Sequence, residues 1–303
     1  MNFLLFLLAY VAVIACVGII LMKICGYRKK PVHNRWELYP VAHELGDRAS
    51  YGGSYFEDNE WWKKKQEISL VGAIKGFLEE ALFLHATYVH NRPLWNFTYP
   101  FHVGLYLLLG SFALTILCAL FPVSFFIGLA FISGFFGYLL VLAGAAGLLH
   151  RRLNTPDLRK FSMPEHYFNL GLFIAFGALG LLLSFSGFGG VERSAKFFWG
   201  VMTFSPALVA EASSFLYGLY LLVCYVILVW VPFSFMGHAF MKYFTWHDIR
   251  WGNQPTQDNP NIADGMRENA GRPVSWKAPH IQGDGRKTWA EVNATNPTQK
   301  GKE

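Results

Sequence analysis

Long runs of hydrophobic residues dominate the first 245 positions of the chain. A helix crosses the hydrocarbon core of a bilayer with about 20 apolar residues, and five segments reach roughly that length: 2–22, 101–120, 125–150, 167–188 and 212–241. The 49 residues 101–149 contain no Asp, Glu, Lys or Arg, and Pro122 supplies a turn that divides them into two spans. The last span is long enough to tilt or to extend past the membrane. The pattern predicts an all-α integral membrane protein with five transmembrane helices.

Two polar regions accompany the spans. Within residues 27–100, the stretch 68–90 is amphipathic and predicts a helix that lies along the membrane surface. Its apolar residues at helical spacing are Leu70, Val71, Ile74, Phe77, Leu78, Ala81 and Leu82. Its histidines, His85 and His90, could alternatively contribute to a quinone site or a docking face, but the surface-helix interpretation is favoured.

The region from residue 246 is an extended polar tail with few aliphatic residues, and we expect it to lack a core of its own. Its tryptophans Trp251, Trp276 and Trp289 suggest that it drapes over a partner, since tryptophan is a frequent interface anchor. The predicted organisation is therefore a first transmembrane helix (1–26), a Trp-rich segment with the interfacial helix (27–100), a four-helix membrane domain (101–245) and a partner-binding tail (246–303).

Composition narrows the class of protein further. Hydrophobic residues make up 53% of the 303 residues and charged residues only 15%, which excludes a disordered chain, a disulfide-stapled secreted domain and an ordinary soluble enzyme. We expect membrane lipid, and no nucleic acid, among its partners. The four cysteines, Cys16, Cys25, Cys118 and Cys224, form no Cys-x-x-Cys pair for zinc or covalent haem and no iron-sulfur ligand set.

The basic residues predict the orientation. Of the 26 Lys and Arg, 24 lie at residue 23, in 27–100, in 150–165 or after 241, and only Arg193 and Lys196 lie on the other side. Because basic residues that flank spans stay in the cytoplasm, we expect the N-terminus outside and the C-terminus inside a multi-pass protein of the cytoplasmic (inner) membrane. The segment around Cys16 loosely resembles a lipoprotein cleavage box, but no basic residue precedes the apolar run, so an uncleaved first span is favoured.

Histidines at the span ends are the candidate cofactor ligands. Four of the ten, His102, His150, His166 and His238, fall at the predicted cytoplasmic ends of spans two to five, and His238 is predicted about one turn inside its span. A b-type haem needs two imidazoles from different helices, with small residues nearby, and Gly104, Gly110, Gly218 and Gly237 supply these. For His102 and His238 an iron ligand and an interfacial residue are both open from the pattern alone. For His150 and His166 the interfacial role is favoured.

Several motifs resemble a known family. The five spans, His102 at the start of the second, His-Arg-Arg-Leu-Asn-Thr-Pro-Asp-Leu-Arg (150–159) and Pro-Phe-Ser-Phe-Met-Gly-His (232–238) resemble the gamma subunit of respiratory nitrate reductase over residues 100–250. Other segments are similar to the membrane cytochrome subunits of redox complexes from sulfate- and metal-reducing anaerobes. These complexes include the sulfite-reduction-associated complex and transmembrane cytochrome complexes whose soluble partner resembles the catalytic subunit of heterodisulfide reductase. The segments are Arg-Trp-Glu-Leu-Tyr-Pro-Val-Ala-His-Glu (35–44), Tyr-Gly-Gly-Ser-Tyr (51–55) and Val-Ser-Trp-Lys-Ala-Pro-His-Ile (274–281).

The resemblance implies haem ligands. In that family, spans two and five hold two stacked haems, and the cytoplasmic-side ligand pair falls on His102 and His238 of this chain. The outer pair falls on Phe112 and Tyr220, which do not replace imidazole, so we expect a single haem b near the cytoplasmic face. Arg151 and Arg152 are then candidates to neutralise the haem propionates. His150 and His166 remain weaker ligand candidates.

The function implied is that of a membrane b-type cytochrome subunit of a quinone-linked oxidoreductase complex in anaerobic respiration. It would exchange electrons between menaquinone and a cytoplasmic iron-sulfur subunit resembling the catalytic subunit of heterodisulfide reductase, with a periplasmic multihaem cytochrome c as an additional candidate partner. With one haem near the inner face, we expect the quinone site close to it. The alternative is a haem-free anchor that scaffolds a redox complex. A transporter is disfavoured because no charged residue lies mid-membrane and no internal repeat is evident.

Overall fold

The computed structural model covers 303 residues, and seven ranges of it are described here. These are 2–29, 41–44, 47–65, 67–244, 251, 260–276 and 284–295. The chain falls into two compact units, the first made of residues 1–20 and 71–237 and the second of residues 21–70 and 238–303.

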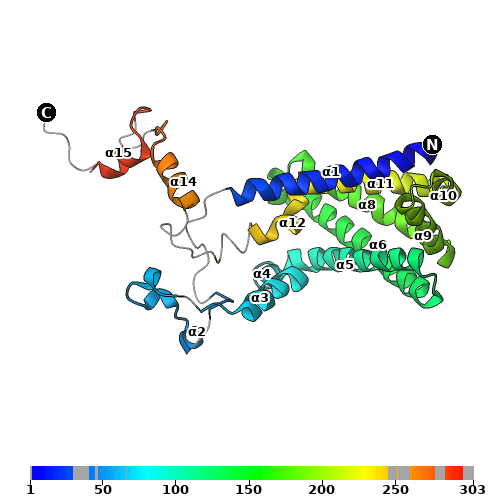
Figure 1. Ribbon diagram of the computed structural model, residues 1–303, viewed down its shortest axis with the longest axis horizontal. Coiled ribbons are helices and arrows are strands. Elements are labelled where there is room, and N and C mark those ends of the chain that lie inside the picture. Colours follow the sequence, from blue (N-terminus) through cyan, green and yellow to red (C-terminus); the bar gives the residue numbers. More distant parts are fainter. Residues whose placement is uncertain are drawn as a thin grey trace. The chain divides into compact units, whose positions relative to one another are not determined.

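Five long apolar helices make the chain a multi-pass membrane protein (Figure 1). They are α1 (Asn2–Arg28), α5 (Arg92–Leu120), α6 (Ser124–Asn154), α8 (Pro164–Ser184) and α11 (Phe215–Phe233). The predicted break at Pro122 is confirmed, since α5 ends at Leu120 and α6 begins at Ser124. Among the described residues the secondary structure is otherwise helical or irregular, with two isolated β-bridges. The all-α membrane fold expected from the hydrophobic pattern is thereby confirmed.

Glycines bring α5 and α6 into close backbone contact. A Cβ added at Gly144 of α6 would lie 2.7 Å from the backbone nitrogen of Phe101, and one added at Gly104 would lie 2.7 Å from the backbone nitrogen of Val141. Small residues at such contacts let membrane helices approach closely enough for extensive van der Waals packing. Gly104, which the sequence suggested would make room for a porphyrin, therefore packs α5 against α6 instead. Phe101, which lies against Gly144, is 3% exposed and meets Phe173 of α8 edge to face, with ring centroids 5.1 Å apart.

The same pattern joins α6 to α8. A Cβ at Gly177 of α8 would lie 3.0 Å from the Cβ of Leu142, and one at Gly180 would lie 2.2 Å from the ring of Tyr138. Both glycines are buried in α8. Helices α5, α6 and α8 thus form one tightly packed layer of the bundle, which fixes the relative heights of the residues they carry.

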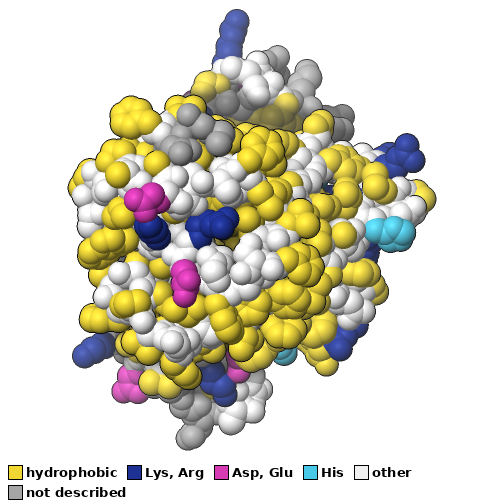
Figure 2. Space-filling model, turned by 90° about the vertical axis from the view of Figure 1, so that its right-hand side faces the viewer, with side chains coloured by type: hydrophobic (Ala, Val, Ile, Leu, Met, Phe, Trp, Pro, Cys, Tyr) yellow, Lys and Arg dark blue, Asp and Glu magenta, His cyan; other side chains and the backbone are white. Residues whose placement is uncertain are grey.

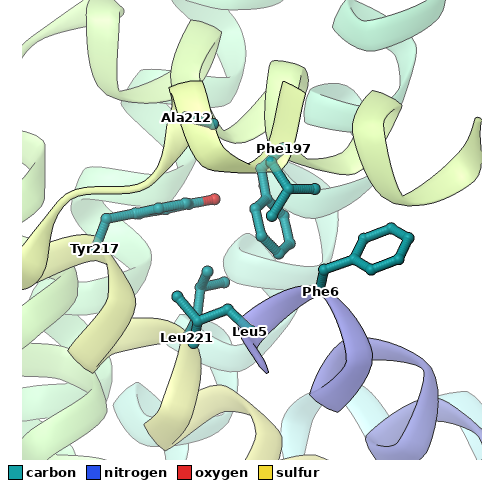
Figure 3. Close-up of a cluster of buried hydrophobic side chains, with 7 residues drawn as sticks. Leu5, Phe6, Phe197, Ala212, Tyr217 and Leu221 are labelled. Carbon is teal, nitrogen blue, oxygen red and sulfur yellow. The ribbon is translucent and has the colours of Figure 1, made fainter. Parts of the chain in front are cut away.

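Two shorter helices, α9 (Phe188–Met202) and α10 (Pro206–Ala212), close one end of the bundle. The sequence predicts an interfacial segment here, but Phe197 is only 2% exposed. In Figure 3 its ring points toward Leu5 of α1 and Leu221 of α11, beside Tyr217. Figure 2 shows this end as mainly hydrophobic with a small group of charged side chains. The segment is therefore part of the core on one side and faces outward on the other, as expected of a strongly amphipathic helix.

The fifth span is shorter than the hydrophobic run predicts. Ser213 and Ser214 separate α10 from α11, and the Ser214 hydroxyl caps α11 by accepting from the backbone N–H of Tyr217 at 3.3 Å. At the other end, Pro232 has no N–H to continue the helical ladder, and α11 ends at Phe233. A 3₁₀ turn, Phe235–Gly237, and the short α12, His238–Lys242, follow.

The helix predicted over residues 68–90 is present in two pieces. Helix α3 (Leu70–Phe83) and helix α4 (His85–His90) meet at Leu84, which has a left-handed backbone with φ of 52°. The apolar side chains of α3 are largely exposed, with Val71 at 79% and Leu70 at 71%. An exposed apolar stripe of this kind is what a helix on a membrane surface requires.

Short elements form the described part of the second unit. Buried Glu44 accepts a hydrogen bond from the Ser54 hydroxyl at 2.7 Å, which ties residues 41–44 to the segment with α2 (Asp47–Tyr51), η1 (Tyr55–Glu57) and η2 (Trp61–Lys63). The tail contains α14 (Pro260–Ala270) and α15 (Trp289–Ala294), with Val274 1% exposed between them. Residues 35–40 and 277–281, which carry part of the family resemblance, lie outside the described residues.

Candidate functional site

His102 lies on α5 with its imidazole oriented by the helix itself. Its Nδ1 is 2.8 Å from the carbonyl oxygen of Thr98, one turn earlier. A carbonyl oxygen only accepts hydrogen bonds, so Nδ1 donates and carries the proton. In the neutral ring this leaves the lone pair on Nε2. A histidine whose Nδ1–H is held by a carbonyl, with Nε2 as the basic nitrogen, is the usual arrangement of a metal ligand.

Aromatic residues fix the part of α5 around His102. The Trp95 indole N–H donates to the carbonyl of Phe83 at 2.9 Å, and the Tyr106 hydroxyl donates to the carbonyl of Ala81. These two bonds join α5 to α3. Two turns beyond His102, on the same side of α5, Leu109 is 66% exposed. This side of α5 therefore contacts α3 around Trp95 and Tyr106, and it is exposed at Leu109.

His150 and His166 adopt the opposite tautomer. The Asn154 amide nitrogen lies 3.0 Å from His150 Nδ1 and also donates to the His150 carbonyl at 2.8 Å, which fixes it as the donor. The backbone N–H of Met163 donates to His166 Nδ1 at 3.0 Å. In both neutral rings the lone pair of Nδ1 is used, so the proton is on Nε2. Both side chains serve local helix-end structure in this arrangement.

His238 is the first residue of α12 and belongs to the second unit. The prediction that it lies about one turn inside a continuous fifth span is wrong, because α11 ends five residues earlier at Phe233 and the chain passes through a 3₁₀ turn. Gly237 occupies that turn, where a Cβ would lie 2.9 Å from the carbonyl oxygen of Pro232. The two predicted ligands are thus found on different types of element, His102 within a long span and His238 at the start of a short helix after one.

The structure separates the two candidate arginines. Arg152 donates from Nη1 to the Ser162 hydroxyl at 2.8 Å, which connects the end of α6 to the segment before α8. Arg151 has a buried Nη1 with no hydrogen-bond acceptor among the described residues. Arg151, unlike Arg152, therefore has a buried N–H group that a bound ligand could accept from.

Asn169 is a buried polar residue that the sequence reading did not select. It lies on α8, is 2% exposed, and its Oδ1 accepts from the indole N–H of Trp230 on α11 at 2.6 Å. Its Nδ2 has no hydrogen-bond acceptor among the described residues. A signal was present in the sequence, since Asn169 is a strongly polar residue within an otherwise apolar span.

Tyr220 and Phe112, onto which the resemblance maps the outer ligand pair, pack against other aromatic side chains. The Tyr220 hydroxyl is 2.5 Å from the Tyr138 hydroxyl, and its ring stacks on Phe176 with centroids 5.7 Å apart. Phe112 is 48% exposed and meets Phe198 edge to face. A nearby cavity of about 80 Å³ has a partly polar lining that includes Ser111, Ser184, Ser194, Tyr138, Tyr217 and Tyr220. This volume accommodates a few water molecules and is well below the size of a cofactor pocket.

The remaining histidines of the surface helix, His85 and His90, lie at the two ends of α4 and are exposed. Comparisons of the chain with protein-family models, with curated proteins and with solved structures find no match. The functional argument therefore depends on the residues described above.

Proposed function

We propose that the chain is a membrane b-type cytochrome subunit that exchanges electrons between the quinone pool and a soluble redox partner through one haem b. The observation that carries the proposal is the tautomer of His102, whose Nδ1–H is held by the Thr98 carbonyl and whose Nε2 has the lone pair. Of the three span-end histidines with defined hydrogen bonds, His102 alone has the ligand tautomer. His238, which the sequence pattern selects, is the proposed second axial ligand.

The donors around this end of the bundle fit a haem. Haem iron held by two imidazoles supplies one-electron transfer when bound, while its carboxylates require donors or cations from the protein. His102 holds the iron in this proposal, and the buried Nη1 of Arg151 and Nδ2 of Asn169 are donors that lack an acceptor within the described chain.

Packing in the other half of the bundle supports a single haem. The Tyr138–Tyr220 hydrogen bond and the stacking of Tyr220 on Phe176 fill the interior where a second ligand pair would be needed. With one haem near the face that carries most of the basic residues, the quinone site is proposed close to that haem. Menaquinone is the proposed substrate. The proposed membrane is the cytoplasmic one.

The polar regions support a soluble partner. We propose that the second unit and the tail bind a cytoplasmic iron-sulfur subunit of the kind that resembles the catalytic subunit of heterodisulfide reductase. Trp276 of the tail is 47% exposed and Tyr51 is 65% exposed, so both are accessible as interface anchors. A periplasmic multihaem cytochrome c is a further proposed partner.

A redox titration of the purified full-length protein tests the proposal. We expect a dithionite-reduced minus oxidised spectrum with a b-type α band, and a titration that fits one component at one haem per chain. Absence of haem after expression with excess haem would favour the anchor function instead. Two b-type components would contradict the single-haem part of the proposal and leave the cytochrome part standing.

A further inference from the structure

The small cavity in the half of the bundle away from His102 has a partly polar lining. Its volume is about 80 Å³, and α5, α6, α8, α9 and α11 all contribute residues to it. Eight of the lining residues carry a hydroxyl group. They are Ser111, Thr115, Tyr138, Ser184, Ser186, Ser194, Tyr217 and Tyr220. Hydroxyl groups around a space within a membrane domain need polar partners, so this cavity suits a polar occupant.

The serine hydroxyls have their protons already in use. Ser111, Ser184 and Ser194 each donate to a backbone carbonyl, at 2.8, 2.8 and 3.0 Å. A serine hydroxyl has one proton and two lone pairs, so these three groups are left as acceptors. Water supplies the donors that such oxygens need, and the volume accommodates a few water molecules.

Among the described residues that line the cavity, Arg193 of α9 alone is charged. Its Nη1 donates to the Ser214 hydroxyl at 3.3 Å, and the same hydroxyl accepts from the backbone N–H of Tyr217 in the first turn of α11. This partner is neutral, and it lies at the positive end of the α11 dipole. The charge of the Arg193 guanidinium is therefore left without compensation by Ser214.

The next cation along α9 provides a contrast. Lys196 forms an ion pair with Glu211 of α10, and neither of these residues lines the cavity. The ion pairs found within the described parts of the chain do not include Arg193. Two cations three residues apart thus differ in their surroundings: Lys196 has a carboxylate, whereas Arg193 has a polar cavity.

An anion is the occupant that matches this cavity. A second cation would be repelled by Arg193, and an apolar group would leave the hydroxyl groups without partners. Water alone satisfies the hydroxyl groups but gives the guanidinium no counter-charge, which a cation in a membrane domain usually has. The volume restricts the anion to the size of a few water molecules, and a halide ion meets that limit.

We propose that the cavity binds a small inorganic anion of about the size of chloride, with Arg193 as its counter-charge. The guanidinium donates N–H groups to the anion, and water held by the serine oxygens completes its shell. The site is independent of the proposed haem, since it lies in the other half of the bundle. Because its lining comes from five helices, the bound anion stabilises the folded bundle.

Thermal unfolding at constant ionic strength tests the site. Full-length protein in a neutral detergent is kept in sodium gluconate, whose anion is too large for the cavity, and chloride replaces gluconate stepwise. The unfolding midpoint is recorded for the wild type, Arg193→Gln and Arg193→Lys. Lys196→Gln is the matched control, because it removes a cation from the same helix without changing the lining of the cavity.

We expect the wild-type midpoint to rise by a few degrees, following the logarithm of the chloride concentration once this exceeds the dissociation constant. Arg193→Gln should lose the rise, whereas Arg193→Lys and Lys196→Gln should retain it. A wild type that does not respond to chloride would overturn the proposal. An equal response in Arg193→Gln would also overturn it, because the effect would then be one of general salt.

A second pair of variants keeps the test decisive if Arg193→Gln does not fold. Ser111 donates to the carbonyl of Ala130 and lines the cavity, whereas Ser133 donates to the carbonyl of Leu107 and does not. Ser111→Val should weaken the chloride response, and Ser133→Val should leave it unchanged. Equal responses in these two variants would contradict a site in this cavity.

A lipid phosphate would offer the Arg193 guanidinium the same chemistry as a free anion. The titration is therefore repeated in nanodiscs of phosphatidylglycerol. A chloride response that persists in the nanodiscs supports a free anion in the cavity. A response confined to lipid-free detergent would assign Arg193 to a lipid headgroup and overturn the proposal.

Discussion

Replacement of His102 by alanine is expected to abolish the b-type spectrum of the purified protein. The structure gives the reason: Nδ1 of His102 donates to the Thr98 carbonyl, so Nε2 is the basic nitrogen presented by α5. Alanine has no ligand atom, and a haem left with one imidazole loses most of its affinity and its low-spin spectrum. The measurement is haem content per chain by the pyridine haemochromogen assay, together with the α band of the reduced protein.

The chain supplies matched controls for this experiment. His150→Ala and His166→Ala remove histidines at the ends of neighbouring helices whose Nδ1 atoms accept hydrogen bonds. Both variants should retain the haem. His238→Ala should lose it, as His102→Ala does, if His238 is the second ligand. Haem retained in full by His102→Ala, or lost equally in all four variants, would refute the assignment of His102.

Gly144→Ala is expected to destabilise the bundle although it adds only one methyl group. A Cβ at this position would lie 2.7 Å from the backbone nitrogen of Phe101 and 2.8 Å from its Cα, so α5 has to move away from α6. Overpacking of this kind typically costs about 1–3 kcal/mol, and here the obstructing atoms belong to the backbone and cannot change rotamer. The free energy of unfolding in mixed detergent micelles measures the effect.

Gly128→Ala is the control within the same helix. A Cβ at Gly128 meets nothing within 4 Å, and alanine has the better helix propensity by about 1 kcal/mol. This variant should be as stable as the wild type or slightly more stable. Equal destabilisation by both substitutions would mean that the loss comes from α6 itself and not from its contact with α5.

The number and approximate positions of the spans were predictable from the sequence, because a charge-free run of about 20 apolar residues has few alternatives to a membrane helix. Their ends were less predictable. The run up to position 241 stays apolar, but Pro232 lacks the N–H that the helical ladder needs, so α11 ends at Phe233. The burial of Phe197 was not predictable, because hydrophobicity alone does not indicate which side of a helix meets the core.

The candidate site was predictable only in part. His102 stood out because an imidazole in a span needs a partner, but its tautomer depends on the Thr98 carbonyl, which a sequence does not place. Arg151 and Arg152 are equivalent in the sequence. In the structure Arg152 donates to the Ser162 hydroxyl, whereas Nη1 of Arg151 is buried without an acceptor among the described residues. A glycine in a helix permits the close approach either of a cofactor or of a second helix, and the sequence does not distinguish the two. At Gly104 the position of Val141 shows that a second helix approaches.

The short connection between α5 and α6 bears on how the protein would acquire the proposed haem. Only residues 121–123 separate the two helices, and α5 with α6 makes the most extensive helix pairing in the first unit. A hairpin of this kind closes a small loop, so little chain entropy opposes its formation, and it should assemble early during insertion. His102 would then be held in its liganding tautomer before the later elements fold. Haem loading would be a late step of assembly, which follows the α5–α6 hairpin and does not create it.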